Sequence, residues 1–251
     1  KEYNIKYYKK NKKNILERSD LHYKENTEKK LAYSKKYREN NVDKIKKSPH
    51  TVWRGLNIEL TEREKHNAHK AVVLWLTGLS GSGKSTIAAA LEKRLFQHHC
   101  KTMLLDGDNI RHGLCSDLGF SALDRKENIR RAGEVAKLFF DNGNIVLCTF
   151  ISPFKQDRDF VRSLFPEGRF VEIHVRCDME ECRRRDPNGL YEKAHSGLIK
   201  DFTGLTSPYE APEKPEIIID TKNNSVQKCV DMLEKYLTDK NISNETQVSE
   251  T

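Results

Sequence analysis

Residues 78–86 of the 251-residue chain bring glycines, hydroxyl residues and one lysine together at the spacing of a phosphate-binding loop: Gly78, Leu79, Ser80, Gly81, Ser82, Gly83, Lys84, Ser85 and Thr86. The glycines permit backbone conformations in which successive N–H groups can point at phosphate oxygens. Lys84 is spaced to supply positive charge to the β- and γ-phosphates, and the Ser85 hydroxyl to bind Mg²⁺. The segment predicts a site for ATP and Mg²⁺; the alternative is a glycine-rich turn that binds nothing.

The flanking sequence predicts the elements that such a loop requires. An apolar run at 71–77 has the length and β-branched content of a buried strand, and apolar residues recur at helical spacing after Lys84. A strand, a glycine-rich turn and a helix form the context in which this motif binds phosphate. The N-terminus of the helix would add the positive end of its dipole.

Strand and helix patterns continue to alternate along the chain. Strands are expected at 71–77, 101–106, 144–151, 169–175 and 216–220, and helices at 84–98, 124–141, 155–164, 178–185 and 225–238. This order predicts the α/β class, with a parallel sheet of about five strands covered by helices on both faces. Ligands of such sheets bind at the carboxyl ends of the strands, so the loop, Asp106, Asp108 and Ser152 should share one cleft.

The positive charge is confined to the start of the chain. The net charge is +8, but residues 1–50 carry 16 Lys and Arg against 7 Asp and Glu, and the rest carries 29 against 30. A Tyr-x-x-Asn-x-x-x-x-Leu/Ile pattern begins at Tyr8, Tyr23 and Tyr37. We expect a helical or disordered basic arm at 1–50, a folded domain at 51–240 and a disordered tail at 241–251. The arm is either a solvated extension or an electrostatic contact for an acidic surface or nucleic acid.

The cysteines and the hydropathy predict a cytoplasmic protein. The six cysteines form no Cys-x-x-Cys pair and no metal-ligand spacing with histidine, which favours a reducing compartment over a disulfide framework. No segment approaches the apolar length of a membrane span, and no signal-peptide hydrophobic region is present.

An ordered set of further motifs accompanies the loop. They lie at 77–86 (TGLSGSGKST), 105–111 (LDGDNIR), 119–121 (GFS), 124–131 (DRKENIRR), 150–153 (FISP), 185–187 (RDP), 189–191 (Gly-Leu-Tyr), 200–204 (KDFTG), 208–212 (PYEAP) and 215–216 (PE). In this order they resemble the adenylylsulfate kinase (APS kinase) family over about 51–240. The resemblance implies ATP-dependent phosphorylation of the 3′-hydroxyl of adenylyl sulfate, which gives 3′-phosphoadenylyl sulfate (PAPS) and ADP in sulfate assimilation. It also implies a homodimer.

The resemblance assigns roles to residues outside the loop. Asp108 would orient or deprotonate the 3′-hydroxyl, and Asp106 would support the metal-water shell beside Ser85. Arginines would fork onto phosphate and sulfate oxygens, asparagines would hydrogen-bond sugar or base, and two phenyl rings would clamp the adenine. The expected acceptor-binding residues are Asp108, Asn109, Arg111, Phe120, Arg125, Asn128, Ile151, Ser152, Lys193, Phe202, Leu205 and Thr206, and Arg130 is a further candidate. Taken singly, these residues also fit an Asp-Gly turn, core aromatics and a solvated helix face.

Two features of the resemblance concern catalysis and a mobile lid. Ser152 matches the active-site serine of the family, but no evident base adjoins it in the sequence, so we expect direct transfer from ATP. Residues 186–212 match the lid, with Gly189, Gly197 and Gly204 as possible hinges. Asn188 and Glu192 stand where the family generally carries lysine, whereas Lys193 and Lys200 remain.

Two other functions are compatible with the phosphate loop. A kinase of another small hydroxyl substrate would keep the loop but would not need the motifs at 105–111 and 200–204. An ATP-binding regulatory module would lose catalytic groups, yet these remain intact: Lys84, Ser85, Asp108, Arg125, Asn128 and Ser152. We therefore expect a kinase in which Lys84, Asp108 and Ser152 serve the reaction.

Overall fold

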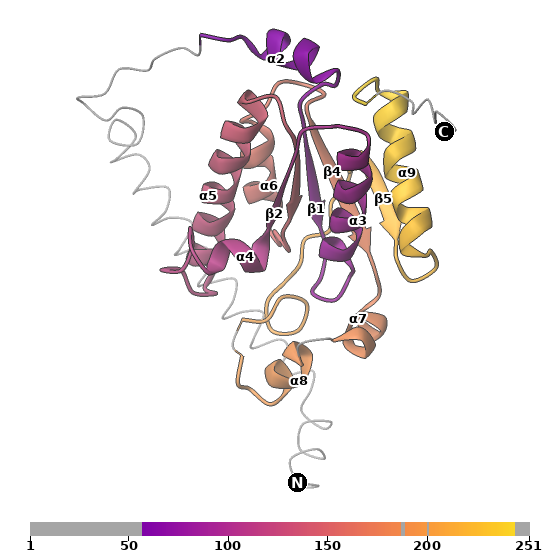
Figure 1. Cartoon of the computed structure of the whole chain (residues 1–251). Helices are drawn as coiled ribbons and strands as arrows, with labels where there is room; N and C mark the ends of the chain where they lie inside the picture. The colour runs from indigo at the N-terminus through magenta and orange to yellow at the C-terminus, as the bar shows by residue number, and fades with distance from the viewer. Residues whose placement is uncertain (1–56, 187–188, 200, 244–251) are drawn as a thin grey trace, which may run out of the picture. The chain divides into compact units, whose positions relative to one another are not determined.

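A computed structural model describes residues 57–186, 189–199 and 201–243 (Figure 1). The predicted arm at 1–50 and residues 244–251 of the predicted tail lie outside the described residues, as do Asn188 and Lys200. Among the described helices, none has both the length and the apolar character needed to cross a lipid bilayer.

The centre of the fold is a parallel sheet of five strands in the order β2-β3-β1-β4-β5. The strands are β1 (Val72–Thr77), β2 (Thr102–Asp106), β3 (Ile145–Thr149), β4 (Phe170–Arg176) and β5 (Ile217–Asp220). In the register, Leu74 of β1 lies opposite Leu147 on one side and Val171 on the other. All six residues of β1 are buried because this strand is central, and the predicted fold class is confirmed.

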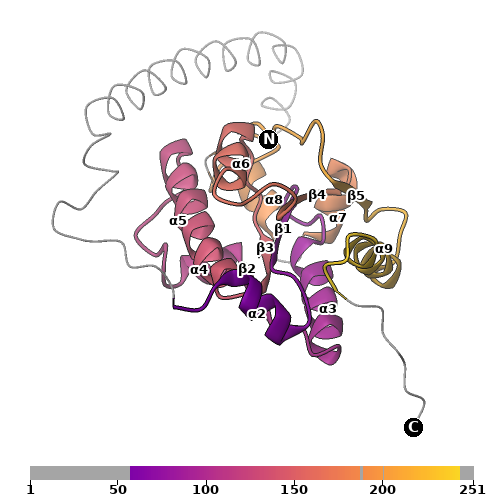
Figure 2. The ribbon, with the colours of Figure 1, turned by 90° about the horizontal axis from the view of Figure 1, so that it is seen from above.

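Helices cover both faces of the sheet (Figures 1 and 2). On one face α3 (Lys84–Gln97) and α9 (Val226–Asp239) pack in a cluster that includes Leu74 and Leu76. On the other face α5 (Ala122–Asp141) and α6 (Lys155–Arg162) pack in a cluster that includes Val73 and Trp75. Successive strand residues point to opposite faces, so β1 supplies both cores.

The structure contains three short helices that the sequence patterns did not predict. They are α2 (Leu60–Asn67), α4 (Gly107–Arg111) and α8 (Leu190–His195). An Asp-Gly turn was the alternative interpretation of the segment after Asp106, but the Asp106 carboxylate accepts hydrogen bonds from the N–H groups of Asp108 and Asn109 and so caps a helix. With α7 (Met179–Arg185), α8 lies beyond the carboxyl ends of the strands (Figure 1). The predicted strand 144–151 ends at Thr149, before the turn at Ser152.

Candidate active site

The phosphate loop connects β1 to α3, as predicted, and all three of its glycines have positive φ angles. Gly81 has a φ of 76° and Gly83, the N-cap of α3, has a φ of 94°. A Cβ atom on Gly81 would lie 2.8 Å from the carbonyl oxygen of Cys182. A side chain at this position would therefore strain the backbone and displace α7 from the loop.

Lys84 lies inside the loop rather than in solvent. Its Nζ donates hydrogen bonds to the carbonyl oxygens of Gly78 and Leu79, at 2.9 Å and 2.8 Å. Burial lowers the pKa of Lys84 to about 8, while the nearby Asp108 and Asp106 carboxylates oppose that shift. Anionic phosphates would oppose it further, because a neighbouring negative charge favours the protonated amine. The loop thus holds an amine whose charge would be reinforced by the ligand.

Asp106, at the end of β2, joins three segments of the site. Its Oδ2 accepts hydrogen bonds from the hydroxyls of Ser85, at 2.6 Å, and Thr149, at 2.7 Å. Burial by itself would raise the pKa of Asp106, but these hydroxyls and the N–H groups of Asp108 and Asn109 outweigh it and lower the pKa. Asp106 is therefore ionised at neutral pH.

These residues fit the requirements of Mg²⁺. The ion takes oxygen ligands and is usually held through one or two carboxylates together with substrate phosphates and water. The Ser85 hydroxyl donates a hydrogen bond to Asp106, so the lone pairs of its Oγ are left to face a cation. Within residues 57–186, 189–199 and 201–243, no three His, Cys, Asp or Glu side chains gather into a metal site.

Side chains from distant segments hold the loop. The sequence analysis gave them no role in the site, although Arg185 and Tyr191 stand in its motifs at 185–187 and 189–191. The Tyr191 hydroxyl of α8 donates to the carbonyl oxygen of Ser80 at 2.9 Å, and the Thr221 hydroxyl donates to that of Ser82 at 2.9 Å. Arg185 in turn donates to the carbonyl oxygen of Thr221 at 2.7 Å. The Oγ of Ser82 is buried without a hydrogen-bond partner among the described residues.

Arg125 of α5 connects the two predicted phenylalanine segments. Its Nε donates to the carbonyl oxygen of Phe120 at 2.9 Å, and its Nη2 donates to that of Asp201 at 2.7 Å. The Phe120 ring is exposed, and the Arg111 guanidinium lies 4.4 Å from its centroid. Phe202 is buried with its ring edge-on to Tyr191 at 4.8 Å. The Arg125 guanidinium thus joins the backbone at Phe120 to the backbone at Asp201, the residue before Phe202.

Asn128 lies one turn after Arg125 on the same helix and is buried, as is the arginine. Its Nδ2 has no hydrogen-bond partner, an arrangement that is costly unless a ligand supplies an acceptor. Asp108 and Asn109 are exposed on α4. Asp108 is close enough to Lys84 and Arg111 to raise the pKa of both, although burial is the largest influence on each and lowers it.

Ser152 follows β3 in a turn whose hydrogen bonds occupy its side chain. The residue is buried and its backbone has a φ of 38°, an angle that residues other than glycine rarely adopt. Its Oγ accepts a hydrogen bond from the indole Nε1 of Trp75 at 3.1 Å and lies 3.4 Å from the carbonyl oxygen of Phe150. The neighbouring Ile151 carbonyl accepts from Thr77 at 2.7 Å. These contacts hold the Ser152 hydroxyl in place within the turn.

The remaining predicted residues are less closely tied to the loop. Thr206 accepts a hydrogen bond from the Phe202 N–H, and Leu205 packs in the cluster that contains Phe202. Lys193 and Glu192 are exposed on α8, and Glu192 lines a hollow of about 680 Å³. Arg130, a candidate anion ligand, instead pairs with Glu127 on the surface of α5. Ser85 and Thr86 are exposed at the start of α3.

Known proteins resemble this chain over most of its length. A family model described as adenylylsulphate kinase matches residues 70–220. The adenylyl-sulfate kinase of Staphylococcus carnosus is 54% identical over 196 residues, 78% of this chain and 98% of that protein. The structure of the Mycobacterium tuberculosis APS kinase CysC in complex with AMPPNP and APS has a TM-score of 0.65 and 40% identity, covering 67% and 98% of the two chains. A hexameric APS kinase from Thiobacillus denitrificans has a TM-score of 0.55 and 33% identity, covering 73% of this chain and 32% of the other.

Proposed function

The chain belongs to the adenylylsulphate kinase family, and from this premise we propose that it transfers the γ-phosphoryl group of ATP to the 3′-hydroxyl of adenylyl sulfate. The products are PAPS and ADP. One observation supports adenylyl sulfate as the acceptor. Arg125 hydrogen-bonds the backbone carbonyls of Phe120 and Asp201, and so brings the segments of Phe120 and Phe202 to one guanidinium. In the acceptor half of the site, a flat purine would bind between the rings of Phe120 and Phe202. The unpartnered Asn128 amide would supply a hydrogen-bond donor to it.

The donor half of the site positions charge for phosphoryl transfer. Lys84 would neutralise charge on the β- and γ-phosphates, and the N–H groups at the start of α3 would bind their oxygens. Ser85 and Asp106 would hold Mg²⁺, which when bound supplies electrostatic stabilisation of the phosphate charge. Asp108 is our candidate to accept or orient the proton of the 3′-hydroxyl, because it lies beside Lys84 and Arg111 at the same edge of the sheet.

The site also supports transfer without a phosphoserine. The Ser152 hydroxyl is buried and hydrogen-bonded to Trp75, so it is neither free nor paired with a base that could activate it. In-line transfer requires only that the two substrates be held in register. Ser152 then contributes the shape of the turn after β3 rather than a covalent intermediate.

We place the protein in a reducing compartment, the cytoplasm, as a homodimer. All six cysteines lie in the described part of the chain and are free thiols, which is typical of reducing conditions. Light scattering after size-exclusion chromatography would distinguish a dimer from a monomer or a larger assembly.

For the arm at 1–50, the basic charge alone supports an acidic partner, and binding to DNA, RNA and anionic vesicles with and without the arm would test it.

The decisive experiment measures ADP release with ATP, Mg²⁺ and adenylyl sulfate. AMP, a nucleoside and a sugar acid serve as control acceptors. We expect turnover only with adenylyl sulfate. Tight ATP binding without turnover on any acceptor would instead favour a regulatory module, and turnover on a control acceptor would favour a different small-molecule kinase.

A further inference from the structure

Arg158 of α6 lies beneath the turn that carries Ser152 and is almost completely buried, with 2% exposure. Its guanidinium donates three hydrogen bonds to three different segments. Nη1 donates to the carbonyl oxygen of Ser152 at 2.8 Å, Nη2 to that of Glu210 at 2.8 Å, and Nε to the Glu172 carboxylate at 2.6 Å. We call 151–153 the acceptor turn. We call 208–212, the last residues of the predicted lid, the return segment, because the chain runs from them back to the sheet.

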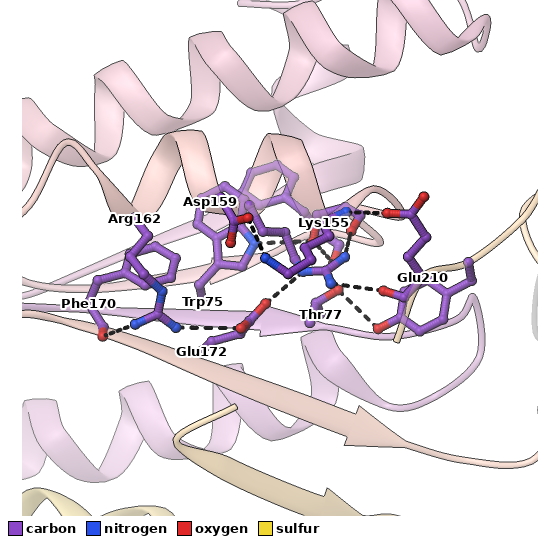
Figure 3. A network of polar contacts seen from close by, with 12 residues as sticks. Trp75, Thr77, Lys155, Asp159, Arg162, Phe170, Glu172 and Glu210 are labelled. Atoms are coloured by element: carbon purple, nitrogen blue, oxygen red, sulfur yellow. Dashed lines mark hydrogen bonds and ion pairs between the residues drawn. The ribbon is translucent and has the colours of Figure 1, made fainter. Parts of the chain in front are cut away.

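Other contacts connect the same two segments (Figure 3). The Glu210 N–H donates to the carbonyl oxygen of Pro153 at 2.8 Å, and the Glu210 carboxylate accepts from the Lys155 N–H at 2.7 Å. The Thr77 hydroxyl donates to Ile151 and lies 3.1 Å from the Tyr209 hydroxyl. Arg158 is thus the buried centre of a network in which the end of β1, the acceptor turn and the return segment meet.

The geometry of this network requires an arginine. A planar guanidinium presents donors in a fixed fork and can satisfy two carbonyls and a carboxylate at once. A lysine carries its three donors on a single nitrogen, so it cannot reach all three acceptors. The acceptor turn needs such support because Ser152 has a left-handed backbone that persists only when its surroundings hold it.

We propose that Arg158 is a positioning residue for the phosphoryl transfer, because it fixes the acceptor turn to the return segment of the lid. This inference rests on the proposed function, since the turn is assigned to the acceptor by resemblance. Catalysis by positioning is sensitive to small displacements, and a shift of about 1 Å can reduce the rate by about 10²-fold. Arg158 would act through the turn without touching either substrate.

The test compares Arg158→Lys with Arg162→Lys, a matched control on the same helix. Arg162 lies one turn further on and pairs with Glu216 at 2.6 Å and Glu172 at 3.4 Å, at the outer end of the network. For both variants we would measure kcat, the KM of adenylyl sulfate, the Kd of MgATP, the Tm, and the hydrogen exchange of the Glu210 and Lys155 amides.

We expect Arg158→Lys to lower kcat about 10- to 100-fold and to leave the Kd of MgATP within threefold of wild type. Exchange of the Glu210 and Lys155 amides should accelerate together. Arg162→Lys should keep kcat within twofold whatever its Tm. If Arg158→Lys does not fold, Tyr209→Phe, which removes only the Thr77 contact, should produce a smaller loss of kcat with the same pattern of exchange.

Two results would overturn the inference. Unchanged kcat in Arg158→Lys despite faster amide exchange would show that transfer does not need this connection. Equal losses of kcat in both arginine variants, in proportion to Tm, would show a contribution to stability alone. If the wild-type protein does not phosphorylate adenylyl sulfate, the proposed function fails first, and the kinetic comparison is then made with the acceptor that it does phosphorylate.

Discussion

Replacing Asp106 by asparagine should reverse the hydrogen bond that orients Ser85 toward Mg²⁺. In the wild-type protein Ser85 donates to Oδ2 at 2.6 Å, so its lone pairs can face the metal. If the new amide oxygen keeps the bonds from the N–H groups of Asp108 and Asn109, the amide nitrogen faces Ser85 and Thr149. Ser85 must then accept a hydrogen bond and turn its own hydrogen toward the cation.

The size of the effect follows from the two hydroxyl contacts at Oδ2. A hydrogen bond to a charged group is worth about 1 kcal/mol more than a neutral one, so the two together lose about 2 kcal/mol. If this loss appears in the transition state, kcat/KM falls roughly 30-fold. The Mg²⁺ concentration needed for half-maximal rate should also rise.

The assay is ADP release as a function of Mg²⁺ concentration at saturating ATP and adenylyl sulfate, and kcat/KM at saturating Mg²⁺. Asp231→Asn is the matched control. Asp231 lies on α9, away from the phosphate loop, and forms an ion pair with Arg94 of α3 at 2.8 Å. This variant should leave the Mg²⁺ dependence of ADP release and the kcat/KM unchanged. A kcat/KM for Asp106→Asn within threefold of wild type, with a superimposable Mg²⁺ dependence, would refute the reasoning.

Three further predictions follow from single residues. Burial lowers the pKa of His69 below the usual value of about 6.5, so the unfolded state takes up a proton before the folded state as the pH falls. The free energy of unfolding should therefore fall as the pH drops below 6.5 and stay level above it. Urea titrations between pH 8 and pH 5 would test this. His69→Gln should reduce the slope to the part contributed by His174, whose pKa burial also lowers, and an unchanged slope would refute the role of His69. Ser152→Ala should lose about 1 kcal/mol of stability with the Trp75 bond yet keep measurable turnover; complete inactivity with normal ligand binding would support a phosphoserine. Glu192→Lys should tighten substrate binding by calorimetry, because a negative charge leaves the lid, and unchanged affinity would disprove that role.

The sequence predicted the sheet and the position of the phosphate loop well, because both depend on local patterns. Buried parallel strands are continuous apolar runs, and the phosphate loop is a contiguous motif whose function needs only the strand before it and the helix after it. The link between Ser85 and Asp106, 21 residues apart, was also foreseeable, since both follow strand ends at one edge of the sheet. Short helices such as α4 were missed because one cap, rather than a repeating apolar pattern, starts them.

Only the tertiary structure decided which side chains support the site. Tyr191 contacts Ser80 across 111 positions, Trp75 contacts Ser152 across 77, and Arg158 contacts Glu210 across 52. No local pattern distinguishes these residues from an ordinary core aromatic or a surface arginine, because each partner is a backbone carbonyl or a single hydroxyl. Their roles arise when the parallel strands bring separate loops to one edge, where buried polar groups must find partners far along the chain.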